Sequence, residues 1–200
     1  MDATPTPLPR RLAEAAEASP TLDTLGRALR PIADALVTGP PWESLLRGVP
    51  LGHAAHPLLT DLPIGLWTSS TVLDLVGTDD GRSADRLLGL GVLAAAPTAL
   101  TGLADWRRGR ERVRAVGALH AVLNTGALAL YSASWVLRRR GHRGAGVVVS
   151  LAAGAVTGVS GYLGGHMVLV LGSPHERDEP PGPGVDGPSP GAQDDHRGGA

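Results

Sequence analysis

Cysteine is absent from this chain of 200 residues, and its absence excludes several kinds of chemistry. The chain can form no disulfide, hold no iron–sulfur cluster on cysteine ligands and use no thiol nucleophile. Lysine and phenylalanine are absent as well, so every basic residue is an arginine. The formal net charge is -1 at pH 7. The arginines form short clusters beside apolar segments, a pattern that is typical of membrane topology signals and gives no reason to expect a nucleic-acid ligand.

Motifs of soluble catalysis are missing too. The sequence has no Gly-rich phosphate loop after a strand, no HExxH zinc motif and no GxSxG nucleophile turn. It has instead four long apolar stretches with almost no charge. Each has roughly the 20 residues that a helix needs to cross a bilayer. They cover residues 56–76, 86–106, 117–137 and 145–171.

These stretches predict an all-α fold: a polytopic membrane protein whose four transmembrane helices form a bundle. Trp106 and Trp135 lie near predicted helix ends, where tryptophan is enriched in membrane proteins. They favour this interpretation over the alternative, a soluble domain of buried helical hairpins.

Composition divides the chain into three parts. Residues 1–50 are an N-terminal segment, residues 51–172 the transmembrane domain, and residues 173–200 a tail rich in Gly, Pro, Asp and Ser that we expect to be disordered. We expect residues 1–19 to be loosely ordered and residues 21–37 to form a short amphipathic helix, kinked or divided at Pro31. That helix could lie on the membrane surface or pack against the bundle or a partner, and both positions remain open. We find no internal repeat.

The fourth apolar stretch has small residues at every third or fourth position. Gly154 and Gly158 form one GxxxG spacing, and Gly161 and Gly165 form another. Such a stripe lets helix backbones approach closely in lipid. We favour packing inside the four-helix bundle, and the alternative is a homodimer in which a second copy of the chain packs on the stripe.

Ionisable residues gather at one end of the predicted bundle. Because successive transmembrane helices alternate in direction, the starts of the first and third and the ends of the second and fourth face the same side of the membrane. These four ends carry His56, His120, Asp105 and His166. Ionisable side chains are costly in hydrocarbon, so they usually face the bundle interior beside a partner. We therefore expect a His/Asp-lined pocket near one membrane surface.

Such a pocket suits several functions. Paired imidazoles on facing helices hold b-type haem, and the candidate ligands are His120 and His166 as our first choice, then His56. A proton relay uses the same residue types. The histidines could equally hydrogen-bond to their neighbours and lock the bundle without binding anything.

A divalent metal such as zinc is the other ligand that this set suits. The candidate metal ligands are His56, His120, His166 and Asp105. Asp61, Asn124 and His53 are the residues that we expect to orient the rings from behind. We expect the remaining ionisable residues to be solvated, namely Asp74 near the opposite surface, and His142, His175 and His196.

Four segments carry a resemblance to a known family: LGHAAHPLLTDLPIGLW (residues 51–67), LTGLADW (100–106), LHAVLN (119–124) and GVSGYLGGH (158–166). Together they resemble an uncharacterised bacterial membrane family, domain of unknown function 2231. The resemblance implies a four-helix integral membrane domain of unknown activity. Some relatives carry a Rieske-type iron–sulfur domain after the membrane part, which implies a redox context.

The chain departs from the family pattern in two places. Its tail has no cysteine and cannot hold that iron–sulfur cluster. The first motif of the family often reads His-Pro-Leu-His-Pro, whereas Ala54 and Ala55 follow His53 here. A role for His53 is therefore less well supported than one for His56.

We thus predict an integral protein of the inner (plasma) membrane, a redox-associated component that binds haem or a metal. The alternatives are a non-catalytic structural or interaction protein, and a small transporter or proton-handling protein; whether the chain is an enzyme stays open. Its predicted partners are the lipid bilayer and a redox partner protein, and a second copy of the chain is the partner if the glycine stripe forms a homodimer. A slight excess of arginines on the side that holds both termini predicts that they are cytoplasmic.

Overall fold

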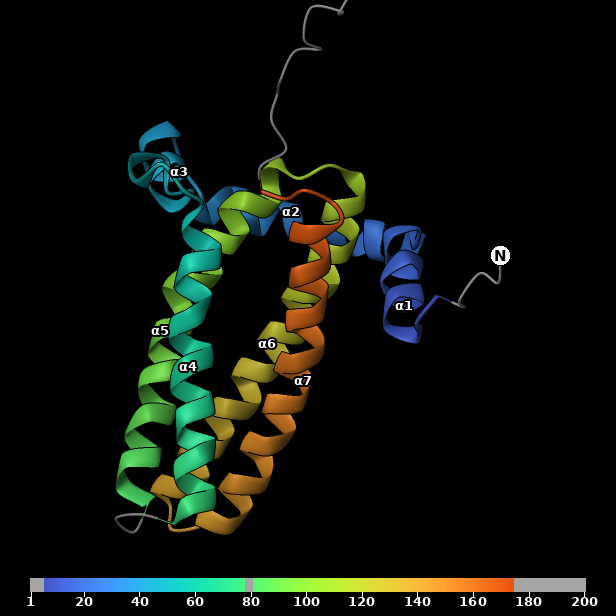
Figure 1. The fold of residues 1–200 in the computed structure, drawn as a ribbon. Helices are drawn as coiled ribbons and strands as arrows, with labels where there is room; N and C mark the ends of the chain where they lie inside the picture. Colours follow the sequence, from blue (N-terminus) through green and yellow to red (C-terminus); the bar gives the residue numbers. More distant parts are fainter. Residues whose placement is uncertain (1–5, 78–80, 175–200) are drawn as a thin grey trace, which may run out of the picture.

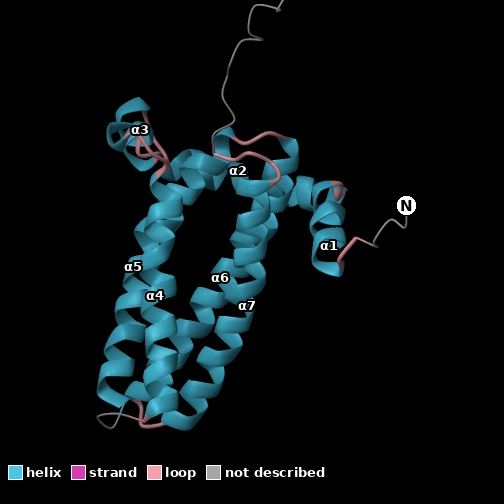
Figure 2. Ribbon diagram, viewed as in Figure 1, coloured by secondary structure: helices cyan, strands magenta, loops and turns pink. Residues whose placement is uncertain are grey.

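The structure, a computed structural model, describes residues 6–77 and 81–174. Within these ranges every regular element is a helix (Figure 2), which confirms the predicted all-α class. Most of the predicted disordered tail, from residue 175 on, lies outside the described residues. The helices are α1 (Leu8–Glu17), α2 (Pro20–Leu36), α3 (Pro40–Leu46), the short 3-10 helix η1 (Val49–Leu51), α4 (Ala55–Val76), α5 (Arg82–Arg108), α6 (Glu111–Arg139) and α7 (Arg143–Leu169).

The four long helices form two hairpins, α4 with α5 and α6 with α7 (Figure 1). The helices pack more closely within each hairpin than between the hairpins. Gly77 ends α4 at a φ of 72°, a left-handed conformation that glycine adopts without strain and that is common after a helix. α4 and α6 run in the same direction, so their first turns lie at the end of the bundle that α2 crosses (Figure 1).

Three of the four long helices are long and apolar enough to cross a membrane, within the described part of the chain. These candidate spans are α5, α6 and α7. α4 has 22 residues, but Asp61, Asp74 and several hydroxyl side chains interrupt its apolar sequence, and it is not among these candidate spans. The predicted membrane character is therefore supported, while the hydropathy of α4 does not by itself mark a fourth span.

Many of the buried residues of the bundle are small, and many of its large aliphatic residues face outward. Ala84, Ala104 and Ser134 are completely enclosed, whereas Leu93 and Leu169 are 68% and 85% exposed. A bundle in water would place its leucines inside. Small residues at the helix contacts let the backbones approach closely, and the outer leucines present an aliphatic surface to lipid.

The N-terminal segment is more ordered than its composition suggests. α1 buries Ala13 and Ala16 in a cluster with Val116 and Leu163 from the bundle. The expectation that residues 1–19 are loosely ordered is therefore wrong for the described part. The physical reason is that two alanines three residues apart form a small flat face on which α1 can pack closely against α6 and α7.

α2 forms where the sequence predicts a helix, and it continues through Pro31 without division. Its N-terminus is capped by Ser19, whose hydroxyl accepts a hydrogen bond from the Leu22 amide at 3.4 Å. α2 packs on the bundle through small residues such as Gly26 and Ala33, which are both buried. Ile32 and Leu36 of α2 stay 56% and 48% exposed.

Ion pairs tie α2 and α3 to the end of α5. Arg107 donates to Asp34 of α2 at 2.8 Å, and Arg108 donates to Glu43 of α3 at 2.7 Å. The N-terminal helices therefore form a polar cap over the end of the bundle that holds His56 and His120.

The glycine stripe of α7 is divided between two environments. A Cβ added at Gly154 would lie 3.6 Å from the Tyr131 hydroxyl. By contrast, a Cβ added at Gly158, Gly161 or Gly165 would meet nothing within 4 Å. The C-terminal half of the stripe thus faces away from the bundle and does not have the internal packing role that we favoured from the sequence.

Candidate histidine site between the hairpins

His56 lies in the first turn of α4 and is held by α5. Its Nδ1 lies 2.9 Å from the backbone oxygen of Thr98. A carbonyl oxygen can only accept a hydrogen bond, so Nδ1 carries the ring proton and Nε2 keeps its electron pair. The Thr98 hydroxyl donates back across the same contact, to the backbone oxygen of Leu59 at 3.2 Å. The ring orientation of His56 is therefore fixed by the α4–α5 contact.

His120 lies on α6 and is held by α7 in the same way. Its Nδ1 donates to the backbone oxygen of Ser160 at 2.8 Å. Its Nε2 accepts a hydrogen bond from the Asn124 amide at 2.9 Å. Both ring nitrogens of His120 thus have a partner, and the Nδ1-protonated tautomer satisfies both bonds.

Each of the two rings lies against a glycine of the neighbouring helix. A Cβ added at Gly102 would come within 2.6 Å of His56 Cε1, and one added at Gly164 within 3.3 Å of His120 Cε1. The close approach of each imidazole to its helix partner therefore depends on the missing side chain.

His56 and His120 meet across the boundary between the hairpins. Their ring centroids are 6.5 Å apart and their planes are perpendicular. Both rings are only partly exposed. Of the three histidines that the sequence placed at this end, these two are the ones that come together.

The two histidines occupy equivalent positions in a structural repeat. An offset of 64 residues relates Asp74 to Arg138, and the same offset relates His56 to His120 and Ser70 to Ser134. Ser70 donates to the backbone oxygen of Ala84 at 2.8 Å, and Ser134 donates to that of Gly146 at 2.6 Å. The hairpin α6–α7 therefore repeats the hairpin α4–α5.

The same offset also relates Trp67 to Tyr131, whose rings stack between the hairpins with centroids 4.0 Å apart. We found no repeat from the sequence, and the structure corrects this. The repeated residues are few and lie far apart along the helices, so they become apparent only when the contacts that they make are compared.

His166 lies away from this pair. It follows Ser160 by six residues, so it is about 9 Å further along α7. Its Nε2 donates to the Glu17 carboxylate of α1 at 2.7 Å, and the His166 side chain is 3% exposed. The structure therefore gives His166, one of our first two candidate ligands, a carboxylate partner in the N-terminal helix.

Asp105 and His53 lie apart from the histidine pair, beside the polar cap. Asp105 Oδ1 is 3.8 Å from Arg47 Nε, too long for a hydrogen bond. Asp105 Oδ2 and Arg47 Nε are both buried and have no hydrogen-bond partner among the described residues. A recess of about 270 Å³ includes Arg47, His53 and Asp105 in its wall. Asp105 is thus directed to Arg47 and not to the histidine pair.

Of the three residues that we expected to orient the rings, one contacts a histidine ring and the other two are exposed to solvent. Asn124 does contact a ring, that of His120. Asp61 is exposed on the outside of α4, and His53 is exposed in the loop before it. No three His, Asp or Glu side chains of residues 6–77 and 81–174 gather closely enough to hold a metal ion.

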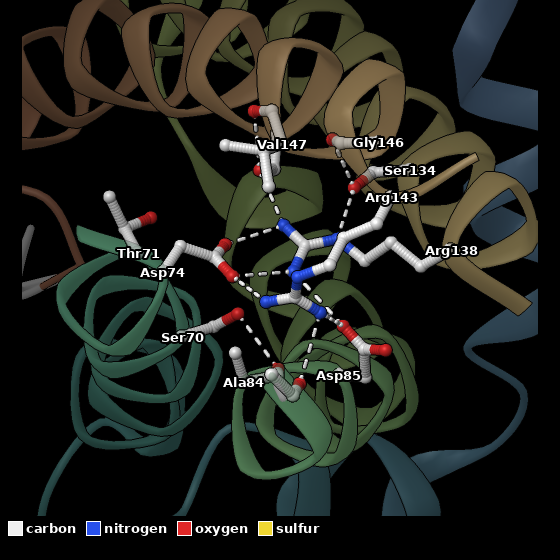
Figure 3. Close-up of polar contacts among 12 residues, drawn as sticks. Ser70, Thr71, Asp74, Ala84, Asp85, Ser134, Arg138, Arg143, Gly146 and Val147 are labelled. Atoms are coloured by element: carbon white, nitrogen blue, oxygen red, sulfur yellow. Dashed lines mark hydrogen bonds and ion pairs between the residues drawn. The ribbon is translucent and has the colours of Figure 1, made fainter. Parts of the chain in front are cut away.

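A buried charge cluster lies at the opposite end of the bundle, and the sequence reasoning missed it (Figure 3). Arg138 of α6 forms a two-pronged pair with Asp74 of α4, with Nη1–Oδ1 and Nη2–Oδ2 distances of 2.9 and 2.7 Å. Arg143 donates to Asp74 too, and to Asp85 at 2.7 Å. The side chains of Asp74 and Arg138 are 2% and 0% exposed. Our expectation that Asp74 is solvated is therefore wrong.

Arg138, at the centre of this cluster, has a hydrogen-bond acceptor for each of its donors. The five N–H groups of the Arg138 guanidinium all find acceptors: Ser134 at 3.2 Å, Asp85 at 3.1 Å, Ser150 at 3.0 Å, and the two oxygens of Asp74. It joins all four long helices. The signal that could have revealed it is the repeat, because Asp74 and Arg138 are opposite charges at equivalent positions.

Comparisons with known proteins agree with the membrane character of this chain. The model of the family described as "Predicted membrane protein (DUF2231)" matches residues 52–175, which is more than half of the chain and includes all four long helices. Neither the curated proteins nor the solved structures contain a match. The chain is therefore a member of the DUF2231 family of predicted membrane proteins.

Proposed function

We propose that this membrane protein binds a haem between its two hairpins, with His56 and His120 as the axial ligands, and that it acts as a redox-associated component of the inner membrane. One observation carries the proposal. Both rings donate Nδ1–H to a backbone carbonyl of the neighbouring helix, at 2.9 and 2.8 Å, and they meet across the hairpin boundary. Such a second bond fixes the ring and makes Nε2 a better ligand.

The number of available ligands favours haem over a bare metal ion. A structural zinc site needs about four protein ligands. Haem iron already has four porphyrin nitrogens and takes only its axial ligands from the protein. Two metal–nitrogen bonds of about 2.0–2.1 Å separate two ligand nitrogens by about 4 Å. His56 and His120 would supply two such nitrogens, from rings whose centroids are 6.5 Å apart.

The proposal requires a rearrangement at His120. Nε2 of His120 accepts from Asn124 at 2.9 Å, so that amide must turn away before Nε2 can bind iron. Losing one neutral hydrogen bond costs about 1 kcal/mol, which is small beside the binding energy of a ligand.

A non-catalytic role is the second candidate, and a specific observation favours it. Because both ring nitrogens of His120 already have partners, the ring can act as a lock between α6 and α7 without any ligand. The same experiment separates the two candidates.

The test is the absorption spectrum of protein purified in detergent from cells supplied with haem. The proposal expects a haem Soret band that is lost in His56→Ala and in His120→Ala. His166→Ala and His142→Ala are matched controls and should keep it, since the first pairs with Glu17 and the second is exposed. A wild-type protein with no chromophore, whose two alanine variants only lose thermal stability, would establish the structural role instead.

The position in the membrane completes the proposal. We infer that α4 crosses the bilayer beside α5, since it has 22 residues and packs along α5 as one hairpin. We also infer that both termini are cytoplasmic and that the polar cap faces a redox partner protein there. An alkaline-phosphatase fusion after Gly172 should be inactive, and full activity in the periplasm would reverse this orientation.

The outward half of the glycine stripe supports a further part of the proposal, a homodimer. Gly158, Gly161 and Gly165 leave an open strip on α7 on which a second α7 could pack closely. Gly161→Leu should shift the purified protein from dimer to monomer in light scattering, whereas Gly126→Leu, at an equally open position on α6, should leave the dimer intact.

A further inference from the structure

A recess lies at the end of the bundle opposite the histidine pair. It has a volume of about 610 Å³ and lies between the start of α5 and the end of α6. Three arginines are part of its wall: Arg82, Arg86 and Arg139. All three are exposed, and the described residues offer none of them an ion pair. Among the described residues, this recess therefore presents three positive charges without an ion-pair partner.

The neighbouring arginines differ sharply from these three. Arg138 and Arg143 are fully engaged by Asp74 and Asp85 in the buried cluster. Asp85 also lies on the recess wall, but its Oδ1 accepts bonds from both Arg138 and Arg143. The charge of Asp85 is thus already neutralised, so this carboxylate does not offset the charges of the three arginines on the recess wall.

The wall of the recess is basic at the start of α5 and becomes apolar further along that helix. Arg82 is the first residue of α5, and Leu90 lies eight residues further on, about 12 Å along the helix. Leu90 and Leu93 are 52% and 68% exposed and form the apolar part. Trp135 of α6 lies over Gly89, where an added Cβ would come within 2.8 Å of its ring nitrogen. Arg139 lies over the same tryptophan ring at 4.9 Å from its centroid.

We propose that this recess binds an anionic glycerophospholipid, with its phosphate among Arg82, Arg86 and Arg139 and an acyl chain along Leu90 and Leu93. The recess is complementary to such a lipid. Its arginines lie where the anionic phosphate would be, at the membrane surface, and its leucines lie where the hydrocarbon chain would be, below that surface. Guanidinium groups bind phosphate oxygens in pairs of hydrogen bonds. Basic pockets between membrane helices bind anionic headgroups in the same manner.

The test uses the full chain in detergent, titrated with dioleoyl phosphatidylglycerol while the melting temperature is followed. Dioleoyl phosphatidylcholine, with the same chains and no net charge, is the lipid control, and inorganic phosphate is the control for the anion alone. Phosphatidylglycerol should raise the melting temperature, and neither control should do so. Arg86→Gln should weaken the apparent affinity roughly fivefold, as expected for the loss of one arginine near a headgroup.

Arg140→Gln is the matched variant, because Arg140 is exposed at the same end of α6 but is not part of the recess wall. It should leave the affinity unchanged. Arg82→Gln provides a second recess variant if Arg86→Gln is poorly folded. Equal stabilisation by both lipids, an equal shift with phosphate alone, or equal losses in Arg86→Gln and Arg140→Gln would each overturn the proposal.

Discussion

Replacing Asp74 by asparagine tests whether the buried ion pair with Arg138 holds the two hairpins together. Asparagine keeps the shape of the side chain and one acceptor oxygen but removes the charge. Arg138, whose side chain is 0% exposed, would then remain charged inside the bundle beside a neutral partner. In a low-dielectric interior that uncompensated charge is the main cost of the substitution.

The structure sets the expected size of this effect. Breaking a buried ion pair by removing one partner costs about 3–5 kcal/mol. Arg138 keeps its bonds to Asp85, Ser134 and Ser150, so we expect a loss near the lower limit, about 3 kcal/mol. For a chain of this size that loss lowers the melting temperature by roughly 6–12 °C.

Thermal unfolding in detergent, followed by circular dichroism, measures the effect. Asp61→Asn is the matched control, because it makes the same change on the same helix at an exposed position. We expect that control to change stability by less than about 0.5 kcal/mol. Adding Arg138→Gln to Asp74→Asn should cost less than the sum of the two single losses, since the double variant leaves no lone charge.

A clear outcome would refute this reasoning. If Asp74→Asn melts at the same temperature as Asp61→Asn, the Asp74 carboxylate contributes nothing that its amide cannot replace. The two hairpins would then be held by the stacked Trp67 and Tyr131 rings and the small-residue contacts.

Two further predictions concern the end of the bundle that holds the histidine pair. Gly102→Ala should lower the free energy of unfolding by about 1–3 kcal/mol, because the new methyl group would come within 2.6 Å of His56 Cε1. Gly126→Ala, at an open helical position, should leave the free energy of unfolding unchanged or raise it by up to about 1 kcal/mol. Thermal melts of both variants check this. The hydrogen bond from Arg108, aided by the charges of Arg107 and Arg47, holds the pKa of Glu43 below its ordinary value of 4.5. The stabilisation by the ionised Glu43 carboxylate is therefore fully present above pH 4.5 and is lost as the pH falls through the lower pKa of the folded state. The difference in melting temperature between wild type and Glu43→Gln should therefore be constant near neutral pH and shrink in acid.

The sequence predicted the long helices well because hydropathy reports directly on length and burial in lipid. The stretch predicted over 145–171 corresponds to α7 (Arg143–Leu169), and that over 86–106 lies within α5 (Arg82–Arg108). Alternation of direction correctly placed His56 and His120 at the same end of the bundle. These predictions require only the count of residues and the order of the helices.

The partners of the ionisable residues could not be predicted, because they depend on how each helix is rotated about its axis. Asp61 and Asp74 are both carboxylates on α4, yet one is exposed and the other is buried against Arg138. His166 contacts Glu17, which belongs to a segment that its composition marked as loosely ordered. The repeated spacing from His56 to Asp74 and from His120 to Arg138 is the signal in the sequence that would have brought Asp74 and Arg138 together.

The most direct test of the proposed haem site is the electron paramagnetic resonance spectrum of the oxidised protein. Two imidazole ligands make ferric haem low-spin, so the wild type should give a low-spin signal. His56→Ala and His120→Ala should each convert it to a high-spin signal or lose the haem, and His166→Ala should keep the low-spin signal. A wild-type protein without haem, or a low-spin signal that survives in both His56→Ala and His120→Ala, would contradict the account.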